Sequence, residues 1–293
     1  MKLAFAGKGG AGKTTLTAWT ADYLARHGHN VWLIDADTAL SLGRASGLAR
    51  TDLPAPLINR HDLIMERISS GLINLTPDVE DLPEALSVAV PLGGPTVTGV
   101  AAGRKRLLVM GSITHAGGGC ACEANALLKA LLAHLVYDRD EWVLVDLEAG
   151  VEHLGRGTVA MVDALVVVSE PSLRSLETAS EISQLATGLG LPRQVLALNR
   201  HSCSGMRNRP LASSDATDGK ALHTLAPALA LPERRVAIPT LAGLQERMLE
   251  HAHVTGLPES AMVDEFVTML LQQVMESAHT KQSLAPSRGV CCA

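Results

Sequence analysis

Aromatic residues are scarce in this chain: of 293 residues, two are Phe, two are Tyr and three are Trp. A core must therefore be built from Ala, Val, Leu and Ile, and a surface that stacks nucleobases on aromatic rings is not expected. An excess of basic charge is also missing, since 25 basic side chains stand against 30 acidic ones, for a net charge of -5. This balance argues against broad electrostatic binding to nucleic acid or anionic lipid.

Long apolar runs and a cysteine framework are absent as well. No run approaches the roughly 20 residues of a membrane span, and the apolar stretch at the N-terminus is too short for a secretory signal. We therefore expect a cytoplasmic protein that binds neither membrane nor nucleic acid.

An odd number of cysteines without a secretion signal does not indicate disulfides. The five cysteines are Cys120, Cys122, Cys203, Cys291 and Cys292.

Short apolar runs rich in β-branched residues alternate with helical patterns along the chain. Several runs lack the polar–apolar alternation of a half-exposed strand, which is typical of strands that helices bury on both faces. The alternation predicts an α/β fold with a doubly wound, mostly parallel sheet. The expected strands cover 2–6, 31–36, 72–75, 106–110, 142–147, 164–169, 194–198 and 235–238. The expected helices cover 13–27, 59–69, 122–136, 172–189, 219–229, 240–250 and 259–278.

The chain shows no linker that divides it into two domains. We therefore expect a single domain over residues 1–279. The stretch 86–103 is rich in Gly, Pro and small residues and is expected to be a loop or a poorly ordered insertion. Residues 280–293 lack periodicity and are expected to form a flexible tail.

A phosphate-binding loop follows the first expected strand and precedes the first expected helix. Residues 7–15 read G-K-G-G-A-G-K-T-T and satisfy the pattern G-x-x-x-x-G-K-[ST]. In such a loop, backbone N–H groups and the positive end of the helix surround phosphate oxygens, the lysine reaches the β- and γ-phosphates, and the hydroxyl ligates Mg²⁺. The motif predicts a P-loop NTPase. Its nucleotide-binding residues are Gly9, Gly10, Ala11, Gly12, Lys13, Thr14 and Thr15.

Candidate site residues stand at the ends of four later strands. Asp35 and Asp37 end the second strand and Asp146 ends the apolar run W-V-L-V-D-L, where a carboxylate can orient the attacking water or the Mg²⁺ shell. The alternative is that each carboxylate caps the next helix. Asn199 and Pro239 end two further strands, at the edge where open α/β sheets bind ligands. The alternative for Asn199 is a turn residue.

Cys120 and Cys122 form a C-x-C pair just before an expected helix, whose N–H groups favour thiolates. Two thiolates at this spacing can chelate one soft metal ion but do not complete a tetrahedral site. A two-fold dimer supplies the missing pair. The pair therefore predicts a soft-metal site shared by a homodimer. The alternatives are two buried small residues or a redox pair.

Lys8 adds a resemblance to the motif. The form K-G-G-x-G-K-T resembles the deviant P-loop family of the Min and partition ATPases, the nitrogenase iron protein and several metal-insertion NTPases. More specifically, residues 1–15, 120–136 and 145–158 (V-D-L-E-A-G-V-E-H-L-G-R-G-T) are similar to the CooC family. These are nickel-insertion ATPases that mature carbon monoxide dehydrogenase, and a related ATPase serves acetyl-CoA synthase.

The resemblance implies an Mg²⁺-dependent ATPase and metallochaperone with carbon monoxide dehydrogenase as metal acceptor. It implies that Lys8 reaches across the dimer to the partner's nucleotide. It also implies that Lys8, Lys13, Thr14, Asp37 and Asp146 handle Mg·ATP, that Asn199 and Pro239 line the adenine pocket, and that Cys120 and Cys122 bind nickel or zinc.

The chain departs from the family pattern after Asp37. The family continues with Pro and a further Asp, whereas this chain has Thr38-Ala39-Leu40. We therefore expect the segment after Asp37 to respond differently to the γ-phosphate, or ATP hydrolysis to be slow.

Three other functions are the alternatives to a nickel-insertion ATPase. They are a maturation ATPase for acetyl-CoA synthase, a Min- or partition-type positioning ATPase, and an electron-carrying ATPase with an iron–sulfur cluster.

Overall fold

The computed structural model describes residues 1–68, 77–111, 127, 130, 131, 133, 134, 141–148, 162–201 and 229–279. Within these ranges one sheet has the strand order β3-β4-β2-β5-β1-β6-β7-β8. All neighbours in it are parallel except β3 and β4. The strands are β1 (Lys2–Gly7), β2 (Val31–Ala36), β3 (Val88–Val90), β4 (Lys105–Val109), β5 (Trp142–Leu147), β6 (Ala164–Ser169), β7 (Gln194–His201) and β8 (Arg234–Pro239).

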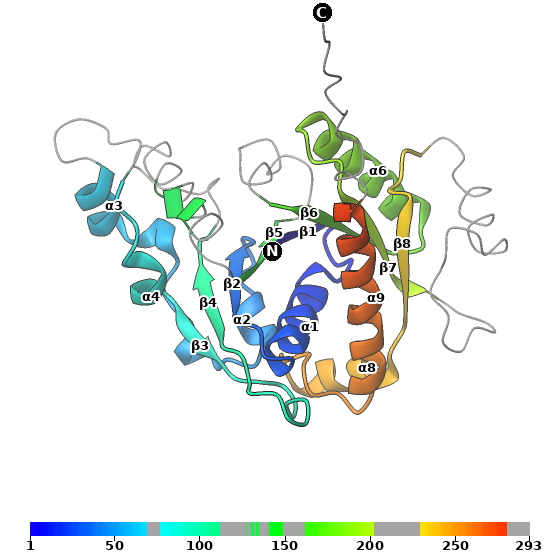
Figure 1. The fold of residues 1–293 in the computed structure, drawn as a ribbon, viewed down its shortest axis with the longest axis horizontal. Helices are drawn as coiled ribbons and strands as arrows, with labels where there is room; N and C mark the ends of the chain where they lie inside the picture. The colour runs from blue at the N-terminus through cyan, green and yellow to red at the C-terminus, as the bar shows by residue number, and fades with distance from the viewer. Residues whose placement is uncertain are drawn as a thin grey trace, which may run out of the picture.

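Helices cover both faces of this sheet (Figure 1). One face packs against α1, α2 and α9, and the other packs against α3, α4, α6 and the helical residues Leu127 and Leu131. The predicted doubly wound α/β fold is therefore confirmed. The helices are α1 (Lys13–Arg26), α2 (Leu42–Ala45), α3 (His61–Ile68), α4 (Leu82–Leu86), α6 (Leu173–Gly188), α8 (Ala242–Glu250) and α9 (Ser260–His279).

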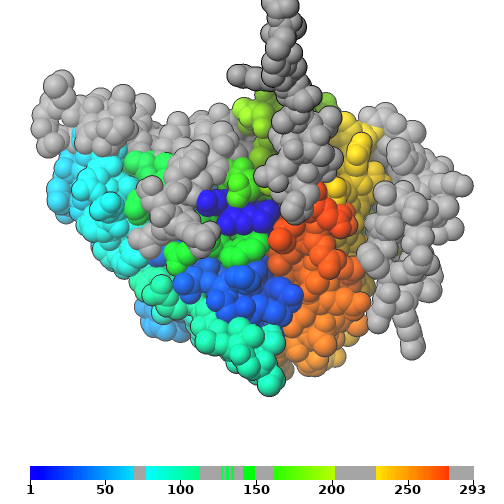
Figure 2. All heavy atoms as spheres, in the orientation of Figure 1, coloured from blue at the N-terminus to red at the C-terminus, as the bar shows by residue number. Residues whose placement is uncertain are grey.

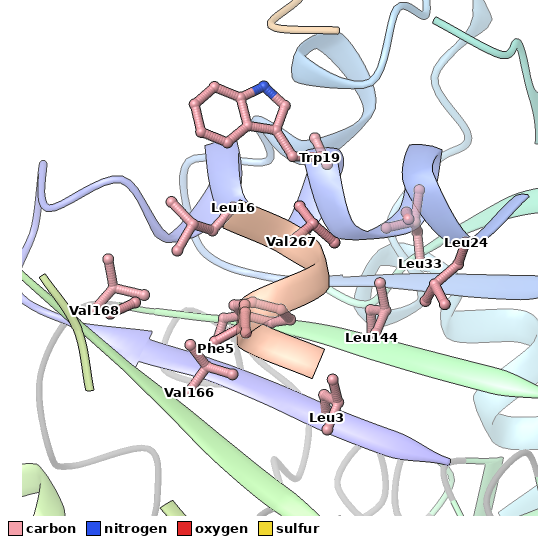
Figure 3. Packing of buried hydrophobic residues seen from close by; sticks show 14 of the residues in the cluster. Leu3, Phe5, Leu16, Trp19, Leu24, Leu33, Leu144, Val166, Val168 and Val267 are labelled. Atoms are coloured by element: carbon pink, nitrogen blue, oxygen red, sulfur yellow. The ribbon is translucent and has the colours of Figure 1, made fainter. Parts of the chain in front are cut away.

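The core around α1 is mostly aliphatic, with Phe5 and Trp19 as its buried aromatic residues. Leu16 and Leu24 point from α1 toward the sheet, where Phe5 is the largest fully buried side chain (Figure 3). Each buried side chain of this size contributes about 1.5–3 kcal/mol of stability. Trp19 points away from the sheet, and its indole Nε1 donates a hydrogen bond of 2.7 Å to the carbonyl of Val254. The helix is thereby fixed on two sides.

The expected elements match the structure to within one to three residues wherever both can be compared. The expected strand 72–75, all but the last residue of the expected helix 219–229, and the tail 280–293 lie outside the described residues. Of the expected helix 122–136, the structure describes five residues, all helical. None of the helices in the described ranges is long and apolar enough to cross a membrane.

The expectation for residues 86–103 is wrong in part. Val88–Val90 form the edge strand β3, antiparallel to β4, with Val88 opposite Leu107. The rest of the segment packs on α1: the Gly93 N–H donates to Asp22 Oδ1 at 2.6 Å, and the Gly103 N–H donates to the Ala25 carbonyl at 2.8 Å. Figure 2 shows the segment (teal) along the lower edge of the molecule, beside orange residues before α9. A three-residue strand between Gly- and Pro-rich neighbours has too weak a pattern to predict.

Candidate nucleotide site

A cavity of about 490 Å³ opens where β1, β2, β7 and β8 end, at the carboxyl edge of the sheet. Ligands bind at this edge in open α/β folds. Most of the residues predicted from the sequence line this cavity, although they come from four separate segments. These residues are Gly9, Gly10, Gly12, Lys13, Thr14, Thr15, Asp37, Asn199 and Pro239.

The loop between β1 and α1 is held by Asn199 from β7. Asn199 Nδ2 donates a hydrogen bond of 2.8 Å to the Ala11 carbonyl. Gly12 has a φ of 104°, and a Cβ at this position would lie 2.2 Å from Asn199 Nδ2. Glycine is therefore required at position 12 both by the backbone conformation and by the close approach of the amide. Lys13 begins α1 directly after this turn and is buried.

Asn199 also shapes the turn that follows it. Its Oδ1 accepts a hydrogen bond of 3.0 Å from the Arg200 N–H, and Arg200 has a φ of 57°. The Arg200 guanidinium pairs with Glu170 at the mouth of the cavity. Asn199 is thus both a cavity residue and a turn residue, and the two sequence interpretations are compatible.

Asp146 lies beside the phosphate loop at the end of β5. Thr14 Oγ1 donates a hydrogen bond of 2.7 Å to Asp146 Oδ2, whereas the buried Oδ1 has no hydrogen-bond partner among the described residues. Burial raises the pKa of Asp146 to about 7, against the opposing effect of the Thr14 hydrogen bond. An unpaired buried carboxylate oxygen next to a hydroxyl fits Mg²⁺, which prefers oxygen ligands.

Asp35 and Asp37 have different environments although they are two residues apart. Asp35 is fully buried and accepts hydrogen bonds from the N–H groups of Leu42 (3.0 Å) and Asp37 (3.3 Å), so it caps α2. Burial raises the pKa of Asp35 to about 7. Asp37 lines the cavity, and its Oδ1 accepts a hydrogen bond of 2.9 Å from the Ala39 N–H. The capping alternative therefore applies to Asp35, and Asp37 stays the candidate for catalysis.

The segment that departs from the family pattern forms a specific contact. Thr38 Oγ1 donates a hydrogen bond of 2.9 Å to Glu148 Oε1. The loop after β2 is thereby joined to the residues after β5. Leu40 has a φ of 46°, which is unusual for a residue other than glycine.

Lys8 stands apart from the cavity. It is partly exposed, does not line the cavity, and forms no ion pair with any residue that the structure describes. Its carbonyl accepts a hydrogen bond of 3.1 Å from the Ala11 N–H.

The predicted soft-metal ligands, Cys120 and Cys122, lie outside the described residues. Within the described part, no three His, Cys, Asp or Glu side chains lie close enough to hold a metal ion. The nickel or zinc site therefore stays a prediction.

Several cavity residues were not predicted from the sequence. Leu244 and Met248 lie one turn apart on α8, and this i, i+4 spacing could have indicated a shared face. Ser41 carries no motif signal, because its position depends on the course of the loop after β2. The remaining residues are Trp19, Ala39, Arg200, Thr240, Leu241 and Gln245.

Comparison with known proteins connects this geometry to a family. Residues 3–225 match the CobQ/CobB/MinD/ParA nucleotide binding domain. The carbon monoxide dehydrogenase accessory protein CooC of Rhodospirillum rubrum is 42% identical over 198 residues, which are 65% of this chain and 71% of that protein.

Solved structures show the same fold at lower identity. A chain of the MinC:MinD cell division complex of Aquifex aeolicus has a TM-score of 0.60 at 19% identity, covering 92% of this chain and 95% of that one. The septum site-determining protein MinD of Pyrococcus horikoshii, complexed with Mg-ADP, has a TM-score of 0.56 at 17% identity, covering 98% and 99%.

Proposed function

The chain belongs to the CobQ/CobB/MinD/ParA nucleotide-binding family and, within it, to the CooC-type accessory ATPases, and from this premise we propose that it is an ATP-dependent nickel metallochaperone. In this proposal a homodimer carries nickel at Cys120 and Cys122, and ATP binding and hydrolysis control its delivery to carbon monoxide dehydrogenase. The single observation that carries the proposal is the 42% identity to the Rhodospirillum rubrum accessory protein.

The phosphate end of the cavity supports nucleotide binding. The loop at Gly9–Gly12 turns around the start of α1, where backbone N–H groups and the helix dipole favour phosphate. Lys13 is buried at this point and brings a positive charge to the β- and γ-phosphates. Asn199, which contacts the phosphate loop, and Pro239 line the same cavity together with apolar residues of α8, which suits the flat, apolar faces of adenine.

The hydrolysis step requires a water molecule placed in line with the γ-phosphate. Asp37 lines the cavity and is the carboxylate proposed to orient this water as it attacks phosphorus and the bond to the β–γ bridging oxygen breaks. Thr14 and Asp146 would hold Mg²⁺, whose charge offsets that of the β- and γ-phosphates when it is bound. Lys8 is proposed to complete the site of the partner subunit, since it forms no ion pair among the described residues of its own chain.

Nickel is the cargo in this proposal. Two thiolates from each chain supply the four ligands that one chain alone cannot. Because the same dimer would bring Lys8 to the partner's nucleotide, the nucleotide state would alter the interface that holds the metal. Delivery would follow when hydrolysis reopens that interface.

A reconstitution assay tests the proposed function. Nickel-deficient carbon monoxide dehydrogenase is incubated anaerobically with the nickel-loaded chain and either ATP or a non-hydrolysable analogue. We expect carbon monoxide oxidation to appear faster with the nickel-loaded chain and ATP than with the same concentration of free nickel. The non-hydrolysable analogue in place of ATP should suppress this gain. Equal activation by free nickel and by the loaded chain would contradict the proposal. Nickel-deficient acetyl-CoA synthase, tested in parallel, decides between the two acceptor enzymes.

A positioning ATPase is the second candidate, because the fold matches MinD chains over most of their length. Positioning on a membrane by an amphipathic helix requires basic residues beside an apolar face. Helix α9 contains Asp264, Glu265 and Glu276 but no Lys or Arg. ATP-dependent pelleting with anionic liposomes would favour this second function, and we expect no such pelleting.

A further inference from the structure

Ser41 is the residue directly before α2, at the end of the loop after β2, but its hydroxyl does not cap that helix. A serine directly before a helix normally accepts a hydrogen bond from an N–H group of the first turn. Here Asp35 Oδ2 accepts from the Leu42 N–H, and the Ser41 side chain forms no capping hydrogen bond. The buried aspartate therefore leaves the serine hydroxyl available for another partner.

The Ser41 hydroxyl points toward the oxygen atoms that fit Mg²⁺. Ser41 lines the nucleotide cavity, and its Oγ lies 3.5 Å from Thr14 Oγ1. Thr14 has one hydroxyl hydrogen, which it donates to Asp146 Oδ2. Any bond between the two hydroxyls must therefore be donated by Ser41. Because the separation exceeds the roughly 2.5–3.0 Å of a normal O–H···O bond, this interaction is weak.

Backbone conformation explains why Ser41 reaches this position. Leu40 has a φ of 46°, a left-handed conformation that costs a leucine about 1–2 kcal/mol. The chain reverses there between Asp37, which faces the cavity, and Leu42, which is fully buried in the core. Strain of this kind persists only where the surrounding structure enforces it, here through the buried Leu42 side chain and the Asp35 cap.

We propose that Ser41 is a further residue of the cation site and that its hydroxyl holds a water molecule of the Mg²⁺ shell. The proposal rests on the proposed nucleotide-binding function. Three oxygen-bearing side chains then converge from three elements: Thr14 from α1, Asp146 from β5 and Ser41 from the loop after β2. Mg²⁺ usually retains several waters and binds few protein ligands directly, so a hydroxyl that positions a water suits it. Asp37 lies in the same loop, so the cation would also fix the loop that carries the catalytic candidate.

Manganese binding to the ADP complex tests this proposal without any turnover. Mn²⁺ replaces Mg²⁺, and its free concentration is read by electron paramagnetic resonance. We expect Ser41→Ala to weaken Mn²⁺ binding about three- to tenfold, the effect of one lost hydrogen bond. Ser41→Thr keeps the hydroxyl and should bind Mn²⁺ nearly as tightly as the natural chain. ADP affinity measured in EDTA should be the same for all three proteins.

Ser46→Ala is the matched control, because Ser46 follows the other end of α2 and its buried Oγ has no partner among the described residues. It should leave Mn²⁺ affinity unchanged, and thermal unfolding checks that each variant is folded. Equal Mn²⁺ affinity for Ser41→Ala and the natural chain would overturn the proposal. So would a matching loss of ADP affinity in EDTA, since that loss would assign Ser41 to the shape of the loop. If the natural chain fails to bind ADP at all, the proposed function itself falls.

Discussion

Lys13 and Asp146 are both buried, although water solvates their charged forms well. Burying such groups costs free energy unless a partner or a ligand compensates. The Thr14 hydroxyl satisfies one oxygen of Asp146, and Lys13 lies close enough to lower the pKa of that carboxyl. The remaining carboxylate oxygen and the lysine charge are what a nucleotide with its cation would complete.

Replacing Lys13 should therefore weaken nucleotide binding without unfolding the chain. We expect Lys13→Ala to weaken ATP binding by about 10- to 100-fold, because hydrogen bonds to charged groups contribute about 1.5–3 kcal/mol. Isothermal titration with a non-hydrolysable ATP analogue measures the change. Lys2→Ala, a lysine at the opposite end of β1, serves as the control. Unchanged affinity in Lys13→Ala would mean that the cavity is not a phosphate site.

Cation affinity should depend on pH through Asp146. Because burial raises its pKa to about 7 in the absence of a cation, the carboxyl is protonated below that pH and a cation must displace the proton. Apparent Mn²⁺ affinity of the ADP complex should therefore fall as pH drops from about 8 to about 6, by up to about tenfold per pH unit. The raised pKa also means that the cation-free fold loses stability as pH rises from 3.8 toward 7. Mn²⁺ affinity that is flat over this pH range would contradict the assignment of Asp146.

At the scale of single residues, the sequence predicted those residues that belong to a local motif. The phosphate loop was predictable because its glycines, Lys13 and Thr14 are contiguous. The position of Asp146 beside the phosphate loop was predictable because it ends an apolar strand, whereas its role toward Mg²⁺ stays a proposal. Ser41 and Met248 were not, because their place in the cavity depends on the course of a loop and on how α8 docks, and neither is encoded in a short pattern.

A buried charge cluster connects elements at the end of α1 that faces away from the nucleotide cavity. Asp22 of α1 accepts hydrogen bonds from Lys105 Nζ of β4 (2.6 Å), Arg26 Nε (2.9 Å) and the Gly93 N–H (2.6 Å). Arg26 also pairs with Asp264 of α9. Two acidic and two basic side chains are thus paired at the place where α1 contacts three other parts of the fold: the sheet, α9 and the segment after β3. Gly93 is needed there, since a Cβ would lie 2.4 Å from the Cβ of Thr255.

Removing one charge from this cluster should destabilise the whole fold. Asp22→Asn leaves Lys105 and Arg26 with one carboxylate between them, and breaking a buried pair in this way costs about 3–5 kcal/mol. Urea unfolding measures the loss. Glu66→Gln, which removes an exposed partner of Arg67 at 3.9 Å, should change stability by less than about 1 kcal/mol. Similar stability losses for the two variants would contradict a structural role for the cluster.

The same cluster predicts a response to acid. Burial alone would raise the pKa of Asp22, but the ion pair with Lys105 and the hydrogen bonds hold it below 3.8. The stabilisation is therefore present above pH 3.8 and is lost as pH falls through the lower pKa of the folded state. Asp22→Asn should remove this part of the acid dependence.

The elements themselves were largely predictable, because most strands are continuous apolar runs and most helices have clear periodicity. Residues 86–103 were not, because Gly and Pro suggest an open loop whereas their actual contacts are with Asp22, Ala25 and Thr255, far away in the sequence. Composition reports local flexibility but not tertiary contacts of this kind.

At the scale of the whole molecule, the described part of the chain contains the cavity proposed as the nucleotide site, whereas Cys120 and Cys122 lie outside the described residues. The family accounts for a cavity of this kind. In the proposed assembly, Cys120 and Cys122 of two chains combine at a shared interface. In this proposal, Lys8 and the cysteine pair are separate features that both need a second copy of the chain.

Nickel stoichiometry measured together with oligomeric state tests this central claim most directly. The chain is titrated anaerobically with Ni²⁺ in the presence of a non-hydrolysable ATP analogue and analysed by gel filtration with metal quantification. We predict one Ni²⁺ per two chains in a dimer peak, and no bound Ni²⁺ in the Cys120→Ser, Cys122→Ser double variant, which should still hydrolyse ATP. One Ni²⁺ per dimer retained by the double variant, or one Ni²⁺ on each monomer of the natural chain, would contradict a nickel site shared across the dimer.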